Sequence, residues 1–189
     1  MSYYSYSQIL GHSQFRNPLD ENAVRKSVAG KNTIFLSHSH QDADMIVAAI
    51  NFLLTLGASV YVDWLDSSMP KTTSGETATK IKAKIVECDR FVVLLSENSR
   101  DSKWVPWELG FADGVKEIQH IAIFPIRRNQ YTYDSAFQGL EYMTLYPVIQ
   151  EGTLKLTNET VPSVFPPPRL GGSGKLLKSG WLETGKVYF

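Results

Sequence analysis

The sequence of 189 residues has one cysteine and no excess of charge of either sign. Cys88 has no second cysteine to pair with, so an intramolecular disulfide is excluded and the composition is compatible with a reducing cytosol. Nineteen basic residues balance nineteen acidic residues, which argues against a nucleic-acid surface or adhesion to an anionic membrane. We therefore expect partners to be recognised at local sites, with no role for nucleic acid or a membrane.

Long apolar runs are also missing. The most apolar stretch, Met45 to Leu56, is interrupted by Asn51 and is too short to span a bilayer. The first ten residues, MSYYSYSQIL, have neither the basic start nor the apolar core of a secretory signal. These absences predict a soluble, cytoplasmic protein. The length predicts one domain of ordinary size with peripheral segments.

The chain does contain short apolar runs that alternate with amphipathic stretches. Phe91 to Leu95 is an unbroken apolar run with β-branched and aromatic members, which suits a central parallel strand. Alternating strands and helices predict an α/β fold, specifically a flavodoxin-like, doubly wound parallel sheet. The expected strands are 33–37, 59–63, 91–96 and 121–126, with a fifth between 142 and 149. Helices are expected from about 43 until Gly57, from a Thr73–Glu76 capping box, and over 105–116.

The two ends of the chain differ from this central pattern. Residues 1–31 are polar and rich in Tyr and Ser, which predicts an N-terminal arm with at most one helical turn near 21–26. The domain is expected to cover 32–149. Residues 150–189 contain three consecutive prolines and the segment RLGGSGK, and are expected to form a C-terminal extension packed on the domain.

The most informative stretch is FVVLLSENSRDSKWVPWEL, residues 91–109. A buried strand leads into a polar loop, and Pro106 suits a helix start because it has no N–H to leave unsatisfied. Glu108 is therefore expected in the first helical turn, above the carboxyl edge of the sheet, where open α/β sheets bind ligands. A structural reading stays open, in which Glu108 favours the helix dipole, Ser102 caps the helix, and Trp104 and Trp107 are core residues.

The end of the first strand is expected to form the other rim of that crevice. Phe35, Leu36, Ser37 and His38 lie at its carboxyl edge, beside the third strand in a flavodoxin-like order. Backbone groups at these positions, and the Ser37 hydroxyl, could contact a sugar or a phosphate. They are candidate substrate-binding residues.

The segment HSHQDAD suggests a metal site at first sight, through His38, His40, Asp42 and Asp44. The spacing matches no standard zinc arrangement, and Ser39 with Asp42 has the spacing of a helix cap. We therefore expect no metal.

Several motifs together resemble one known family. TIFLSHSHQD, the polar loop after VYVDW, GETATKIKAKIVECDR and FVVLLSENSRDSKWVPWEL occur in the order and spacing of the Toll/interleukin-1 receptor (TIR) domain. The resemblance covers roughly residues 32 to 126 and combines several motifs, so it is more specific than one short pattern. Among TIR proteins the chain most resembles the bacterial anti-phage type, and its length is similar to that of TIR subunits of Thoeris defence systems.

The resemblance implies one of two kinds of function. Many TIR domains are non-catalytic scaffolds, whereas others cleave the nicotinamide–ribose bond of NAD with one glutamate, which here matches Glu108. The chain departs from the commonest family pattern at two places. Val105 replaces the frequent cysteine after Trp104, and the loop 64–73 lacks the usual Arg-Asp and Pro-Gly pairs, which argues against adaptor contacts through that loop.

One carboxylate is chemically sufficient for the enzymatic branch. Glycoside cleavage normally uses one acid to protonate the leaving group and another to support the cationic carbon. NAD removes the first need, because nicotinamide leaves as a neutral molecule, so an ionised Glu108 has only to stabilise the developing positive charge. Trp64 or Trp104 could stack on an aromatic ring, and Ser102 is a further candidate for substrate binding.

Exclusion of water would let a nucleophile within the same NAD molecule capture the carbon, giving a cyclic ADP-ribose-type nucleotide. The expected partners are NAD, other copies of the chain, and an effector protein that responds to the nucleotide. NAD serves as substrate, and no cofactor is expected. A nucleoside deoxyribosyltransferase-like enzyme is a further alternative, since it shares the fold type and uses a glutamate on an N-glycosidic bond.

Overall fold

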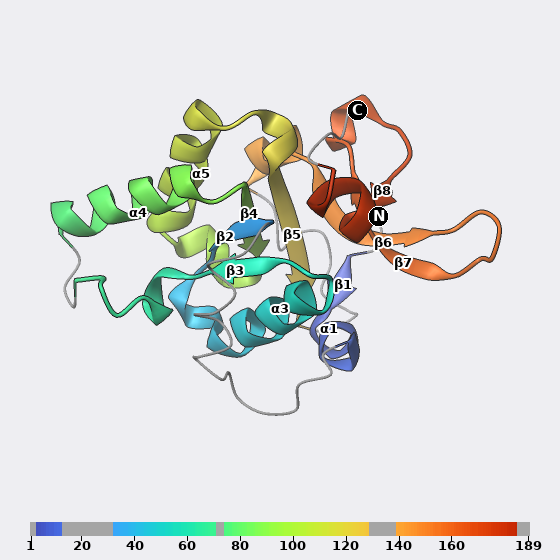
Figure 1. The fold of residues 1–189 in the computed structure, drawn as a ribbon, viewed down its shortest axis with the longest axis horizontal. Helices are drawn as coiled ribbons and strands as arrows, with labels where there is room; N and C mark the ends of the chain where they lie inside the picture. Colours follow the sequence, from blue (N-terminus) through green and yellow to red (C-terminus); the bar gives the residue numbers. More distant parts are fainter. Residues whose placement is uncertain (1–2, 13–31, 71–73, 129–138, 185–189) are drawn as a thin grey trace.

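The computed structural model describes residues 3–12, 32–70, 74–128 and 139–184. A sheet runs through the centre and helices lie on both of its faces (Figure 1). No helix in the described ranges is both long and apolar enough to cross a bilayer. The strands are β1 Tyr4–Ser5, β2 Thr33–Ser37, β3 Ser59–Tyr61, β4 Arg90–Leu95, β5 Ile121–Arg127, β6 Val148–Thr153, β7 Thr160–Phe165 and β8 Lys175–Leu176, and the main helices are α1 Tyr6–His12, α3 Ala43–Thr55, α4 Gly75–Glu87 and α5 Trp104–Val115.

The strand order β3-β2-β4-β5-β6 is the flavodoxin-like order, and these five strands are parallel. The predicted α/β fold is thereby confirmed. The strands predicted at 33–37, 91–96 and 121–126 agree with β2, β4 and β5 to within one residue at each end. The second strand is shorter than expected, because it ends at Tyr61 and Asp63 begins a short 3-10 helix, η2 (Asp63–Leu65).

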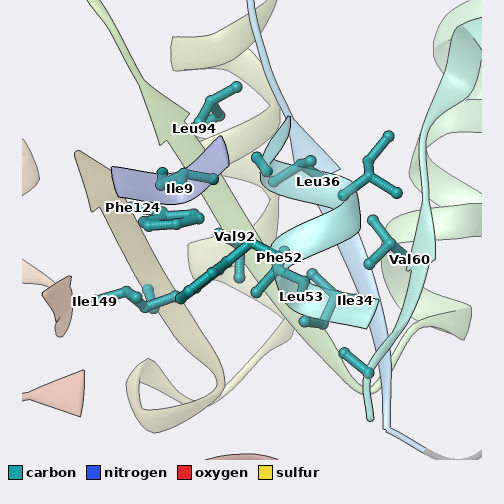
Figure 2. Packing of buried hydrophobic residues seen from close by; sticks show 14 of the residues in the cluster. Ile9, Ile34, Leu36, Phe52, Leu53, Val60, Val92, Leu94, Phe124 and Ile149 are labelled. Atoms are coloured by element: carbon teal, nitrogen blue, oxygen red, sulfur yellow. The ribbon is translucent and has the colours of Figure 1, made fainter. Parts of the chain in front are cut away.

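The two-residue period of β2 and β4 sends alternate side chains to two separate cores. Leu36 and Leu94 face α3, in the cluster drawn in Figure 2, whereas Phe35 and Val93 face α4 and α5. All four side chains are almost completely buried. The sheet is therefore covered on both faces, as expected for central parallel strands with continuous apolar runs.

Part of the N-terminal segment belongs to this packed unit. β1 pairs in parallel with the end of β5, with Tyr4 opposite Ile126. The Tyr4 ring packs against Phe52 and Phe124 at centroid distances of 5.2 and 5.9 Å, and Ile9 of α1 is fully buried. The expectation of an arm with little regular structure is wrong for residues 4–12, because they form β1 and α1 and Tyr4 is a core residue. The helical turn expected near 21–26 lies outside the described residues.

The C-terminal segment also continues the sheet. The fifth parallel strand, β6, starts at Val148 and crosses the boundary expected at residue 149, while 141–145 form a 3-10 helix, η6 (Glu141–Leu145). β7 and β8 then add antiparallel strands to the same sheet. Trp181 is fully buried and its indole Nε1 donates to the Gln119 carbonyl at 2.7 Å. Residues 150–184 are thus integrated into the domain more closely than a packed extension would be.

Local signals set the ends of two helices. Gly57, with φ of +85°, follows α3 as expected, since a left-handed residue there suits glycine. The N-terminus of α4 differs from the predicted Thr73–Glu76 box. Instead Ser74 and Thr77 form the reciprocal capping box, with Ser74 N–H donating to Thr77 Oγ1 at 3.1 Å. Thr73 lies outside the described residues.

Candidate active site

Glu108 lies in the buried stripe of α5, one turn further along the helix than predicted. The helix begins at Trp104, so no acidic residue stands in its first turn. Val105, Glu108, Leu109 and Ala112 are buried at the spacing of one helix face. Only 4% of Glu108 is exposed. The side chain is therefore held against the sheet, away from the helix terminus and its dipole.

Ser37, the last residue of β2, is the hydrogen-bond partner of Glu108. Its Oγ donates to Glu108 Oε2 at 2.5 Å in a buried contact. The carboxyl ends of β2 and β4 meet at the same edge of the sheet, because the strands are parallel neighbours with Ser37 opposite Val93. Both residues were predicted at this edge of the sheet, and the structure adds the direct hydrogen bond between them.

The environment of Glu108 favours its protonated form. Burial raises the pKa of the Glu108 carboxyl to about 8; the Ser37 hydrogen bond acts in the opposite direction, and the Asp63 carboxylate raises the pKa further. At neutral pH the free protein therefore holds this carboxyl mainly uncharged. The expectation of an ionised Glu108 concerns the complex with NAD, in which a positive charge lies close to the carboxyl.

His38, Asp63 and His40 form a polar cluster beside this pair. His38 Nδ1 donates to the Leu36 carbonyl at 2.9 Å, and burial lowers the pKa of the imidazole. The neutral ring therefore presents the lone pair of Nε2, which lies 3.8 Å from Asp63 Oδ1. His40 Nε2 lies 4.0 Å from Asp63 Oδ2 on the solvent side of the cluster.

Asp63 lies in this polar cluster, and the sequence analysis did not propose it as a candidate. It lies two residues after the end of β3, and β3 is the other parallel neighbour of β2. The sequence could have indicated Asp63, because the residues after neighbouring parallel strands lie at one edge of the sheet. The signal was missed because Asp63 was assigned to the strand itself.

Asp42 and Asp44 have other partners than the two histidines. Asp42 is fully buried and accepts hydrogen bonds from Ser96 Oγ and from Asn98 Nδ2, the latter at 2.6 Å. Asp44 forms a two-pronged ion pair with Arg128 at 3.0 and 3.2 Å. Among the described residues, no group of three or more His, Cys, Asp or Glu is arranged to hold a metal ion.

The remaining predicted substrate-binding residues differ in how accessible they are. Phe35 and Leu36 point into opposite cores, so only their backbone groups are available, and the Leu36 carbonyl already bonds His38. Ser102 accepts the N–H of Val105 at 3.2 Å, which supports its capping role. Trp104 is half-buried and meets Trp107 edge to face at 5.3 Å, and Trp64 is 44% exposed. Trp64 and Trp104 thus retain accessible surface.

A separate hollow of about 300 Å³ lies at the carboxyl ends of β4 and β5. Its walls are mostly apolar, and Glu108 does not line it. The side chains that form its walls include Leu95, Pro125, Met143 and Val148.

A comparison with known protein families identifies the class of protein. The TIR domain profile matches residues 34–154, and the chain belongs to the TIR domain family.

Two bacterial proteins show the similarity in more detail. "Probable 3' cyclic ADP-D-ribose synthase ThsB'" of Bacillus cereus (strain MSX-D12) is 42% identical over 123 residues, which are 64% of this chain and 62% of that protein. "Putative cyclic ADP-D-ribose synthase TIR2" of Cytobacillus dafuensis is 30% identical over 105 residues, which are 52% of this chain and 28% of that protein. The chain therefore spans less than two thirds of the length of either relative.

Proposed function

We propose that this chain is a TIR-domain enzyme of bacterial anti-phage defence that cleaves the nicotinamide–ribose bond of NAD and forms a cyclic ADP-ribose-type nucleotide. The observation that carries the proposal is the buried Glu108 carboxyl, bonded by Ser37 at the carboxyl edge of a TIR sheet. The names of the two relatives support the product class. The nucleotide acts on a separate effector protein in the cytoplasm, and NAD is the only small molecule that the reaction needs.

The positive charge of the substrate favours the ionised form of Glu108. NAD brings a pyridinium cation to the site, and an opposite charge within a few ångströms favours the ionised carboxyl. The proton held in the free protein is then released on binding. The resulting carboxylate can accept hydrogen bonds from hydroxyls of the nicotinamide ribose, with Ser37 fixing its orientation.

Cleavage then follows from electrostatics at a buried position. As the bond to nicotinamide lengthens, positive charge moves from the ring to the anomeric carbon, and Glu108 stabilises that charge in a setting of low dielectric constant. Nicotinamide leaves as a neutral molecule. The half-buried Trp104 or the exposed Trp64 can cover the reacting groups, so a hydroxyl of the same NAD molecule competes with water for the carbon.

Product analysis of a carboxamide variant tests this assignment. Purified wild-type protein and Glu108→Gln are incubated with NAD, with and without extract of infected cells, and nicotinamide, ADP-ribose and cyclic products are separated by mass. We expect nicotinamide and a cyclic product from the wild type, and a loss of about 10²-fold or more in Glu108→Gln. The matched control is Glu97→Gln, because Glu97 is an exposed carboxylate in the loop after β4.

The same experiment separates the alternatives. A non-catalytic scaffold would leave NAD intact under every condition. A deoxyribosyltransferase-like enzyme would act on a deoxynucleoside supplied in a parallel reaction, but not on NAD. A folded Glu108→Gln protein with wild-type turnover would contradict the assignment of Glu108.

A further inference from the structure

The formation of a ring from NAD releases one proton, and the structure contains a group placed to receive it. This inference rests on the proposed function. A ribose hydroxyl that attacks the anomeric carbon forms an O–C bond as the C–N bond to nicotinamide breaks. The leaving nicotinamide takes the bonding electron pair and becomes neutral, so it needs no proton. The hydroxyl proton must therefore pass to a base of the protein or to solvent.

Glu108 is poorly suited to both tasks. Its carboxylate has to stay ionised while it stabilises the cationic carbon, and Ser37 already occupies one of its oxygens. Inverting glycosidases divide the work between two carboxyl groups, one of which deprotonates the attacking nucleophile. A second carboxylate at the same edge of the sheet is therefore the feature to look for.

Asp63 is that second carboxylate. It follows β3, the strand beside β2, and its charge is felt at Glu108. Its side chain is 17% exposed, so a ligand can reach it. Oδ1 accepts the N–H of Trp64 at 2.9 Å, which fixes the orientation of the carboxylate. Among the described residues, Oδ2 has no hydrogen-bond donor, and the His40 ring lies 4.0 Å from it.

The neighbouring His38 presents a second acceptor that has no hydrogen-bond donor. His38 Nε2 is buried, has no hydrogen-bond partner among the described residues, and lies 3.8 Å from Asp63 Oδ1. Its Nδ1 carries the proton, because the partner of Nδ1 is a carbonyl oxygen. Two acceptors therefore converge with no donor between them. Buried polar groups in proteins are normally satisfied, so the arrangement is completed by a donor from outside these residues, a ligand hydroxyl or a water molecule.

We propose that Asp63 is the general base of ring closure: it accepts the proton of the attacking ribose hydroxyl and passes it to His40. Of the two acceptors, Asp63 is the more exposed, at 17% against 3% for His38, so it is the one that the hydroxyl reaches. The His40 side chain is 63% exposed, so it can release the proton to buffer. His38 acts as a positioning residue that holds this part of the edge through the Leu36 carbonyl.

The test is the partition between ring closure and hydrolysis. Wild type, Asp63→Asn and Asp66→Asn are incubated with NAD, and cyclic product and ADP-ribose are each divided by the nicotinamide released. Removal of a general base slows the step that it assists by about 10²-fold or more. We expect the cyclic fraction to fall at least about tenfold in Asp63→Asn, because water still captures the carbon, while nicotinamide release changes much less.

Asp66→Asn is the matched control, because Asp66 lies in the same loop but bonds Tyr61 and Ser68. We expect its product ratio to equal that of the wild type. A folded Asp63→Asn protein with the wild-type ratio overturns the proposal. Should Asp63→Asn fail to fold, His40→Ala decides: we expect a reduced cyclic fraction that added imidazole restores, and a ratio unchanged by either overturns the proposal.

The failure of this inference differs from the failure of the proposed function. A wild-type protein that releases nicotinamide but forms only ADP-ribose overturns the base assignment and the cyclic product, and leaves NAD cleavage standing. A wild-type protein that forms the cyclic product while Asp63→Asn keeps the same ratio overturns the base assignment alone. A wild-type protein that never releases nicotinamide overturns both.

Discussion

Two buried carboxyl groups at the carboxyl edge of the sheet, Asp42 and Glu108, differ in how they are satisfied. Asp42 accepts hydrogen bonds from Ser96 and Asn98 and joins the segment after β2 to the loop after β4. Among the described residues, Glu108 has one hydrogen-bond donor, Ser37, and it has apolar neighbours along α5. A buried carboxylate with several donors stabilises a fold, whereas one with few donors has a shifted pKa and is suited to chemistry.

The largest effect expected on stability is at Asp42. Asp42→Ala leaves the Asn98 amide without its acceptor in the interior and should lower the free energy of unfolding by about 3 kcal/mol. Denaturant unfolding measures this. Asp44→Ala is the control, because the exposed Asp44–Arg128 pair should contribute less than about 1 kcal/mol. Equal losses in the two variants would show that the buried network has no special structural role.

The pH dependence of turnover should report the ionisation of Glu108. With a pKa of about 8, roughly one free molecule in a hundred is ionised at Glu108 at pH 6 and about half at pH 8. Because the ionised form is the active one, kcat/KM should rise about fiftyfold between pH 6 and pH 8. Glu97→Gln should show the same rise. A flat profile over this range would contradict an ionisation of Glu108 in the active form.

Glu108→Gln should also change how stability depends on pH. The pKa of Glu108 is about 8 in the folded protein and near the ordinary 4.5 when unfolded, so the native state binds more protons between these values. The free energy of unfolding therefore falls as pH rises, by about 2 kcal/mol between pH 6 and pH 8. Glu108→Gln should remove this part of the slope. Thermal or denaturant unfolding measures the slope of stability against pH, and identical slopes in both proteins would contradict the raised pKa of Glu108.

Ser37→Ala should make Glu108 still harder to ionise. The Ser37 hydrogen bond lowers the pKa of Glu108, so its loss should move the rise of kcat/KM to higher pH by about one unit, a tenfold loss of rate at pH 7. Ser102→Ala is the control, because Ser102 bonds the helix backbone and not Glu108. A profile shifted equally in both variants would point to a general effect on α5.

The smallest expected effect concerns assembly. Trp64 is a large exposed aromatic residue in the loop after β3, and we expect turnover per subunit to rise with protein concentration if a neighbouring copy completes the site. Trp64→Ala should change this concentration response a few-fold while leaving the melting temperature nearly constant. Specific activity that stays constant across a wide dilution series would mean that each monomer carries a complete site.

The apolar runs of the sequence were sufficient to predict the sheet, because a short continuous apolar run with β-branched residues is typical of a strand that is covered on both faces. β2, β4 and β5 were found to within a residue, and so was the edge at which Ser37 meets Glu108. The motif SKWVPWEL singled out Glu108, and several motifs together indicated the TIR family. Segments with mixed polarity were predicted less well: Tyr4 and Ile9 are core residues in a stretch that looks polar.

Only the tertiary structure decided the state and the neighbours of Glu108. Its burial depends on how α5 packs on the sheet, and a pKa of about 8 follows from that desolvation and not from local sequence. The cluster of His38, His40 and Asp63 joins two segments over twenty residues apart, because β2 and β3 are parallel neighbours. Sequence patterns report which residues face a core, whereas distances between side chains on different strands depend on packing of the whole domain.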